Sequence, residues 1–294
     1  MTQMTDVHEF DLTLSDGHTL HGYDVGGEGF PVIWHHGTPN TGALPKPLLG
    51  LADDLGLRWV SFDRPGYGGS TAHEGRTVAS VAGDAAALAD SLGLDRFATV
   101  GHSGGGPPAL ACAALQPARV AAVVTLGGPA PIDAEGLEWF EGMGPTSNAA
   151  LRAAQNGIEG KRLHEQESAD APIDFTARDW KALTGDWGWL GEVAAAGAAS
   201  GIDALIDDDI SYVTPWGVEL ADIIAPVLLV NGSDDQVIPA SHSAWLAAHI
   251  DGAEHWSVDG EGHISSLAAE EHGAADALRW LADRVREYGA PAVA

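Results

Sequence analysis

The chain has 294 residues, of which 45% are hydrophobic, enough for a sizeable core in one large domain or two small ones. Its 42 acidic residues outnumber 14 basic ones, and the net charge of −28 argues against binding to nucleic acid or to an anionic membrane surface. No apolar run reaches membrane-spanning length and residues 1–9 lack the pattern of a signal peptide, so we expect a soluble cytoplasmic protein. The single cysteine, Cys112, is expected to be a core residue.

Short apolar runs alternate with helix-like segments from the N-terminus onward. Strand-like runs at 7–14 and 19–25 flank a turn sequence and predict an antiparallel edge. Strands are then expected at 31–35, 59–62 and 97–100, with helices at 43–55 and 77–92. This alternation predicts a parallel sheet covered by helices on both faces, with the functional loops at the carboxyl ends of the strands.

Ser103 lies in the segment Gly101-His102-Ser103-Gly104-Gly105, between the strand at 97–100 and an Ala-rich helix expected at 107–115. This is the G-x-S-x-G pattern of a nucleophile elbow, in which a strained backbone exposes the serine hydroxyl at a helix N-terminus. Backbone N–H groups there stabilise a developing oxyanion. The pattern alone also fits a plain glycine turn, so the other segments must support it.

The second half of the chain contains a long interruption. A strand at 120–126 is followed by a stretch without regular alternation that holds five of the ten tryptophans and a helix-prone segment at 148–167. It is too long for a loop, so we expect a mostly helical cap at 129–222 between the two parts of a core domain, 1–128 and 223–294. Alternation resumes with a strand at 226–231, a helix at 240–250, a strand at 254–258 and a helix at 264–288.

A serine hydroxyl becomes a strong nucleophile when a base takes its proton, and a third group must orient that base. On elbows of this kind the chain order is serine, acid, histidine. His263 follows the last predicted strand in a glycine-flanked loop, on the same rim as Ser103, so we predict it as the base. Other histidines in this part of the chain are expected in a strand or on helices, where structural roles are more common: His255, His242, His249 and His272.

Two candidates for the acid, Asp234 and Asp235, lie in the loop after the strand at 226–231. Either could be a turn residue that bonds its own backbone, and Asp259 is a weaker third candidate.

The oxyanion would be held by two backbone N–H groups, from Gly104 after the nucleophile and from Thr38 in the loop after the third strand. The side chains of His35 and His36 are expected to be structural, and the loop 63–70 is expected to shape the rim. No group of histidines and carboxylates has metal-ligand spacing, and no glycine-rich segment fits a phosphate or dinucleotide loop. We therefore expect neither a metal nor a cofactor.

Five segments together resemble the α/β-hydrolase superfamily, and they span nearly the whole chain: His36-Gly37-Thr38-Pro39, the loop 63–70, Gly101 to Gly105, Gly232-x-x-Asp235-x-x-x-Pro239 and Gly262-His263. The resemblance implies an α/β fold with an eight-stranded, mostly parallel sheet, helices on both faces and a helical cap after strand six. It also implies that the acid is Asp235, three residues after the glycine and four before the proline.

A serine at the elbow, in place of aspartate, is unlike the epoxide hydrolases and haloalkane dehalogenases of this superfamily. We expect a hydrolase that cleaves a carboxylic ester, or a related acyl bond, of a small apolar molecule through an acyl-enzyme on Ser103. The same triad could serve carbon–carbon bond hydrolysis, thioester hydrolysis, perhydrolysis or acyl transfer, because fold does not choose among them. A ligand-binding protein without turnover is an alternative of a different class.

The predicted cap carries 18 acidic and five basic side chains. If its tryptophans face the rim, they form an apolar pocket within an acidic surface, and anionic esters are disfavoured in a salt-dependent way. The alternative is that the charges form a solvated face and the tryptophans pack inside the cap.

Overall fold

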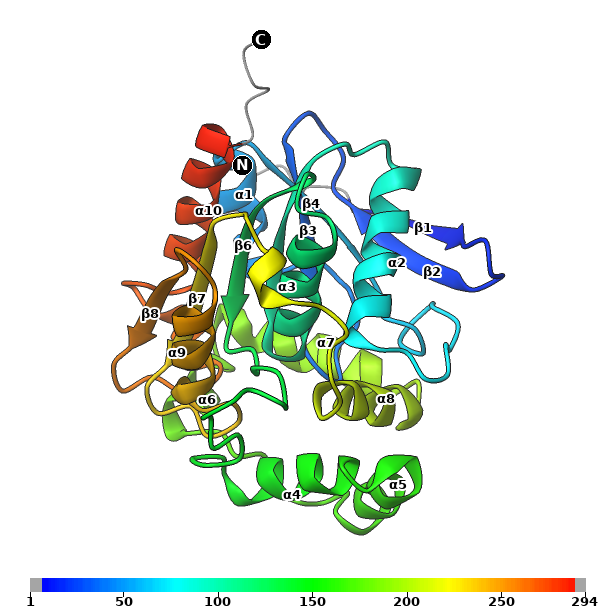
Figure 1. Ribbon diagram of the computed structural model, residues 1–294, viewed down its shortest axis with the longest axis vertical. Helices are drawn as coiled ribbons and strands as arrows, with labels where there is room; N and C mark the ends of the chain where they lie inside the picture. The colour runs from blue at the N-terminus through cyan, green and yellow to red at the C-terminus, as the bar shows by residue number, and fades with distance from the viewer. Residues whose placement is uncertain (1–6, 289–294) are drawn as a thin grey trace.

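One sheet of eight strands organises the protein, whose computed structural model describes residues 7–288. The strand order is β1-β2-β4-β3-β5-β6-β7-β8 (Figure 1). β2 pairs antiparallel with β1 and β4, and all other neighbours are parallel. The strands are β1 (His8–Thr13), β2 (Thr19–Asp24), β3 (Phe30–His35), β4 (Leu57–Phe62), β5 (Phe97–His102), β6 (Val120–Leu126), β7 (Val227–Gly232) and β8 (Glu254–Val258).

The central strands are mostly apolar because both faces of the sheet are covered. Every residue of β5, β6 and β7 is buried. The apolar residues of α2 (Val78–Ser91), α3 (Gly106–Leu115) and α9 (Ala240–His249) share one core cluster with the sheet, and those of α1 (Leu49–Asp54) and α10 (Ala274–Tyr288) share a second. This is the expected α/β architecture, and Cys112 lies buried on α3.

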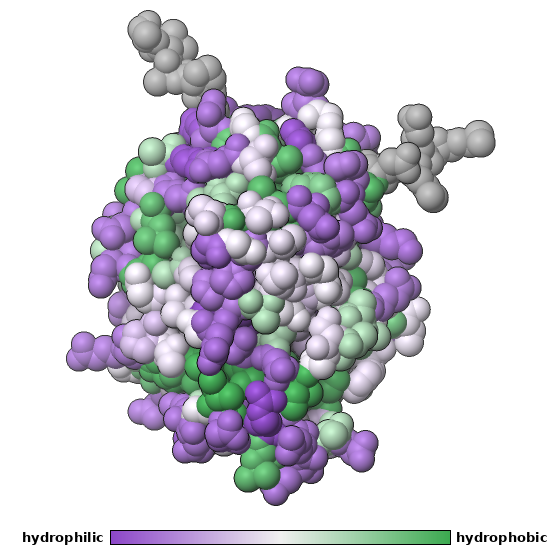
Figure 2. Space-filling view, turned by 90° about the vertical axis from the view of Figure 1, so that its right-hand side faces the viewer, coloured by the Kyte–Doolittle hydropathy of each residue, from purple (hydrophilic) through white to green (hydrophobic). Residues whose placement is uncertain are grey.

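Five helices lie between β6 and β7, within residues 129–222, which we call the cap segment. They are α4 (Pro145–Ala154), α5 (Gly157–Glu167), α6 (Ala177–Ala182), α7 (Trp189–Ala198) and α8 (Asp203–Tyr212). Figure 1 shows α4 and α5 at the lower end of the molecule, away from the sheet. On the face drawn in Figure 2, hydrophobic residues gather towards this same end.

Three helices differ from the sequence-based expectation. The helix expected at 43–55 begins as a 3₁₀ turn, η1 (Lys46–Leu48), because Pro45 and Pro47 cannot donate helical hydrogen bonds. The segment expected to be helical at 148–167 forms two helices, α4 and α5. The helix expected at 264–288 is η5 (Ser265–Ala268) followed by α10, because His272 has a φ of 60°. His272 therefore precedes α10 instead of lying on it.

Short 3₁₀ segments complete the described chain: η2 (Ser103–Gly105), η3 (Asp186–Gly188) and η4 (Leu220–Asp222). No single helix in residues 7–288 is long and apolar enough to cross a membrane. The bent pair Asp186–Ala198 and Asp203–Tyr212 together has the length and composition of a span.

Four of the five cap-segment tryptophans are buried: Trp139, Trp187, Trp189 and Trp216.

Candidate active site

Ser103 lies at the sharp turn between β5 and α3, with a φ of 52° that non-glycine residues rarely adopt. The turn requires glycine on both sides. A Cβ at Gly101 would lie 2.1 Å from the Gly105 carbonyl oxygen, and one at Gly105 would lie 2.0 Å from the His35 carbonyl oxygen. The strand and helix can therefore approach closely enough to expose the hydroxyl only because these positions lack side chains.

The structure brings Ser103, His263 and Asp235 together from three different loops. His263 Nε2 is 2.9 Å from Ser103 Oγ, and His263 Nδ1 is 2.7 Å from Asp235 Oδ2. Asp235 Oδ1 accepts the backbone N–H groups of Val237 and Ile238, which fixes the carboxylate. Because a carboxylate only accepts, Nδ1 donates to Asp235, and Nε2 of the neutral ring is left to accept the Ser103 proton.

The other acidic candidates lie elsewhere. Asp234 is exposed, and its carboxylate accepts the Ser233 hydroxyl. Within residues 7–288, Asp259 has no hydrogen bond to His263.

The electrostatics around His263 favour its protonated form. Burial lowers the pKa of His263, but the charge and hydrogen bond of Asp235, with a contribution from Asp179, outweigh burial and raise it above 6.5. A proton transferred from Ser103 would therefore be stabilised on the ring.

Thr38 and Gly104 lie beside Ser103 on the wall of one cavity. Gly104 is in the first turn of the η2–α3 helix, where backbone N–H groups have no intrahelical acceptor. In the part of the chain that the structure describes, no hydrogen bond takes up the Thr38 N–H. Both predicted oxyanion donors are thus free to bind a negative oxygen.

A buried ionic network holds the Thr38 loop in place. Arg64, after β4, donates to the carbonyl oxygens of His36 and Gly37 and forms an ion pair with Asp208 on α8. Asp208 also accepts the hydroxyl of Thr38 at 2.6 Å and an N–H of Arg76. The loop 63–70 therefore shapes the rim, as expected, by anchoring the Thr38 loop to the cap segment.

Asp179, on α6, holds the His263 loop in place in a similar way. Its buried Oδ1 accepts the backbone N–H groups of Ile264 and Ser265 at 2.7 and 2.8 Å, directly after His263. Sequence reasoning missed both Asp179 and Asp208. The one available signal for Asp179 was the capping box Thr176-x-x-Asp179, which predicts the helix start but not the contact with the His263 loop.

Replacing Asp179 with asparagine should lower kcat by about 10 to 100-fold. The charge that binds the Ile264 and Ser265 N–H groups is lost, and an amide nitrogen would face the Thr176 N–H that now donates to Oδ2, so that a small shift of His263 impairs proton transfer. The exposed aspartate Asp186, also in the cap segment, gives the matched control Asp186→Asn, which should keep full activity. Steady-state kinetics on an activated ester check both. Equal activity of the two variants would show that Asp179 does not position the base.

Four other histidines have structural contacts. His36 lies against the Arg64 backbone N–H, and burial lowers its pKa well below 6.5. His35 is buried beside Cys112, and burial lowers its pKa to about 3. His242 contacts the backbone of Ala130 and Trp139, and His255 contacts the Asn231 side chain.

Two cavities meet at Ser103. The larger has a volume of about 360 Å³ and is walled mainly by apolar side chains of the cap segment, together with His263. The smaller, of about 200 Å³, contains Lys161, Glu165, Asp209 and Tyr212. The half-exposed Trp180 is the one cap-segment tryptophan that lines either of them.

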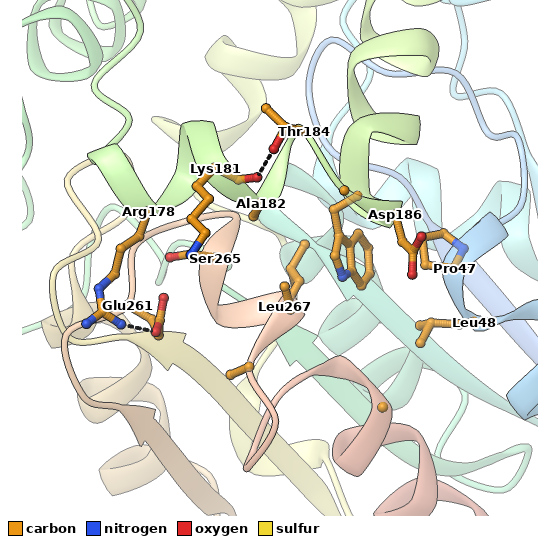
Figure 3. A pocket seen from close by; sticks show the side chains of 15 residues that line it. Pro47, Leu48, Arg178, Lys181, Ala182, Thr184, Asp186, Glu261, Ser265 and Leu267 are labelled. Carbon is orange, nitrogen blue, oxygen red and sulfur yellow. Dashed lines mark hydrogen bonds and ion pairs between the residues drawn. The ribbon is translucent and has the colours of Figure 1, made fainter.

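A still larger hollow of about 840 Å³ lies between α6 and η5 and is drawn in Figure 3. The exposed ion pair between Arg178 and Glu261 stands at one side of it, and none of the three triad residues lines it. This larger hollow is therefore separate from the candidate site at Ser103.

Asp16, His18 and His73 come together at the turn between β1 and β2, although they had no metal-ligand spacing in the sequence. One potential ligand atom from each lies within 4.8 Å of the others. The rings of His18 and His73 are stacked, with centroids 4.4 Å apart.

Comparison with known proteins supports the α/β-hydrolase fold. The family model described as alpha/beta hydrolase fold matches residues 31–269. A non-heme haloperoxidase from Rhodococcus erythropolis is 31% identical over 256 residues, which cover 81% of this chain and 86% of the relative. The structure of an alpha/beta hydrolase fold protein from Nakamurella multipartita has a TM-score of 0.67 at 26% identity, with 96% of this chain and all of that one covered. An enol-lactonase from Burkholderia xenovorans shares the fold, with a TM-score of 0.70 at 20% identity over 94% and 99% of the chains. This chain is an enzyme of the α/β-hydrolase fold family.

Proposed function

We propose that the protein is a serine hydrolase that cleaves a carboxylic ester of a small, apolar molecule through an acyl-enzyme on Ser103. The observation that carries the proposal is the series of short contacts from Ser103 Oγ through His263 to Asp235. The apolar walls of the larger cavity, which include Phe175, Leu183 and Leu190, support an apolar substrate.

In the first half-reaction, Ser103 Oγ attacks the ester carbonyl carbon while His263 Nε2 takes the hydroxyl proton. The backbone N–H groups of Thr38 and Gly104 stabilise the oxyanion. His263 then gives its proton to the alcohol oxygen, the acyl carbon–oxygen bond breaks, and the acyl group stays on Ser103. In the second half-reaction, water loses a proton to His263 and attacks the acyl carbon, and Ser103 regains its proton as the acid leaves.

The acyl-enzyme can be tested by measuring how it divides between reaction with water and reaction with methanol. Two esters with the same acyl group and different alcohols, para-nitrophenyl butyrate and phenyl butyrate, should give the same ratio of methyl butyrate to butyric acid when methanol is added. The ratio is shared because both products arise from one intermediate after the alcohol has left. A ratio that depends on the alcohol would contradict the intermediate.

The pH dependence follows from His263. Because only the neutral ring accepts the Ser103 proton, kcat/KM should fall as the pH drops, with a midpoint above pH 6.5 because the pKa is raised. Protonated His263 stabilises the folded state. This stabilisation is present below the unfolded-state pKa of His263 and is lost as the pH rises through its folded-state pKa, so stability and activity change with pH in opposite directions. Initial rates and thermal midpoints across the pH range check both trends. If the fall in kcat/KM at acid pH had its midpoint below pH 6.5, it would contradict the role of His263 as the base.

Perhydrolysis is a second candidate, favoured by the haloperoxidase name of the Rhodococcus erythropolis relative. Here hydrogen peroxide, in place of water, would attack the acyl-enzyme and release a peracid. The two candidates share the first half-reaction and are separated by adding hydrogen peroxide to the hydrolysis of para-nitrophenyl butyrate and measuring perbutyric acid formed above the rate without enzyme.

A further inference from the structure

The smaller cavity at Ser103 is lined by a group of three charged side chains, one buried and two partly buried, that ester cleavage itself does not use. Lys161, on α5, is 1% exposed, and its Nζ lies 2.6 Å from Glu165 Oε1 and 2.6 Å from Asp209 Oδ2. All three side chains line the same cavity as Ser103. We call these three residues the Lys161 cluster.

The Lys161 ammonium group can donate one more hydrogen bond than its two carboxylate partners accept. An ammonium group has three hydrogens, and the two carboxylates accept two of them. In residues 7–288 no other protein group accepts the third. Burial lowers the pKa of Lys161, but Asp209 and Glu165 outweigh burial and raise it, so the group stays charged. A buried N–H without a partner is costly, and a substrate oxygen in the cavity would remove that cost.

The reaction geometry decides which part of an ester reaches the cluster. His263 must give a proton to the leaving alcohol oxygen, so the alcohol lies on the His263 side. His263 lines the larger, apolar cavity and is absent from the walls of the smaller one. The acyl group therefore extends into the smaller cavity. Its volume of about 200 Å³ holds roughly six non-hydrogen atoms at the ~30 Å³ that a water molecule takes in the liquid.

The charge of the cluster decides which acyl groups fit. One ammonium beside two carboxylates leaves an excess of negative charge, which repels an anionic acyl group. We propose that the Lys161 cluster is a specificity subsite that selects esters whose short acyl chain carries a neutral oxygen acceptor, such as a ketone or hydroxyl. This inference rests on the proposed function, since it requires Ser103 to be acylated.

Three para-nitrophenyl esters of similar length test the subsite: valerate, levulinate, in which a ketone replaces one methylene, and hemiglutarate, which is anionic. After correction for the hydroxide-catalysed rate of each ester, wild-type kcat/KM for levulinate should exceed that for valerate by about tenfold, the effect of one hydrogen bond to a charged group. Hemiglutarate should be the poorest of the three. A levulinate-to-valerate ratio near one, or a preference for hemiglutarate, would overturn the subsite.

Substitutions test whether Lys161 causes the preference for levulinate over valerate. Lys161→Met should bring the ratio close to one, and the double variant Lys161→Met/Asp209→Asn does the same while leaving less uncompensated charge. Lys46→Met, at an exposed lysine outside both cavities, should keep the wild-type ratio. A ratio that survives both Lys161 variants would refute the role of Lys161. If wild-type protein hydrolysed none of the esters, the proposed function would fail, whereas valerate turnover without a preference would refute only the subsite.

Discussion

Ser103→Ala is expected to lower kcat for an activated ester by about 10³-fold or more, the scale for a triad residue. The substitution removes the attacking oxygen, and the small alanine side chain suits the tight turn between β5 and α3. The folded state should therefore persist, which circular dichroism and thermal unfolding check. Steady-state hydrolysis of para-nitrophenyl butyrate measures the loss.

Ser257→Ala is the matched control for this loss. Ser257 is exposed on the edge strand β8 and lines neither cavity at the elbow. Its replacement should leave kcat and KM unchanged. Equal activity of the Ser103 and Ser257 variants would remove Ser103 from the mechanism.

Asp235→Asn is expected to cause the second large loss, of about 10⁴-fold in kcat, as found when the acid of such a triad becomes an amide. An amide nitrogen facing His263 Nδ1 would favour the wrong tautomer, so that Nε2 carries a hydrogen and cannot take the Ser103 proton. Replacement also removes the charge that raises the pKa of His263. The midpoint of the fall in any residual activity at acid pH should therefore lie at a lower pH than in the wild-type protein.

Asp234→Asn provides the neighbouring control. Asp234 is exposed and bonds only Ser233 through its side chain in the described structure, so the variant should retain nearly full activity. Greater sensitivity at Asp234 than at Asp235 would contradict the assignment of the acid. Measuring both variants at several pH values separates loss of chemistry from a shifted pKa.

Much of the core could be predicted because its strands have strong local signals. β6 has the bounds that the apolar run at 120–126 predicts, and β8 has the bounds of the strand expected at 254–258. Ser103 and His263 could be found because glycines that their turns require flank both residues. Asp235 needed the resemblance to the superfamily, since two adjacent aspartates in a turn are equivalent in local chemistry.

The contacts of the cap segment could not be predicted from sequence. The run Asp207-Asp208-Asp209 is typical of a solvated face, yet Asp208 is buried between Arg64 and Arg76, and Asp209 pairs with Lys161. These partners lie between about 50 and 140 positions away in the chain, and no local pattern records such pairings. The cap-segment tryptophans could not be placed either: Trp187, Trp189 and Trp216 pack into the core clusters shared with the sheet, Trp139 packs within the cap segment, and Trp180 lines the larger cavity.

The most direct test of the account is the site of covalent modification by an organophosphonate. The reagent captures a nucleophilic serine that is paired with a base, and peptide mass spectrometry identifies the modified residue. We predict one adduct, on Ser103, that forms with loss of esterase activity and is absent in Ser103→Ala. An adduct on a different serine that inactivates the enzyme, or full activity with Ser103 modified, would contradict the central claim.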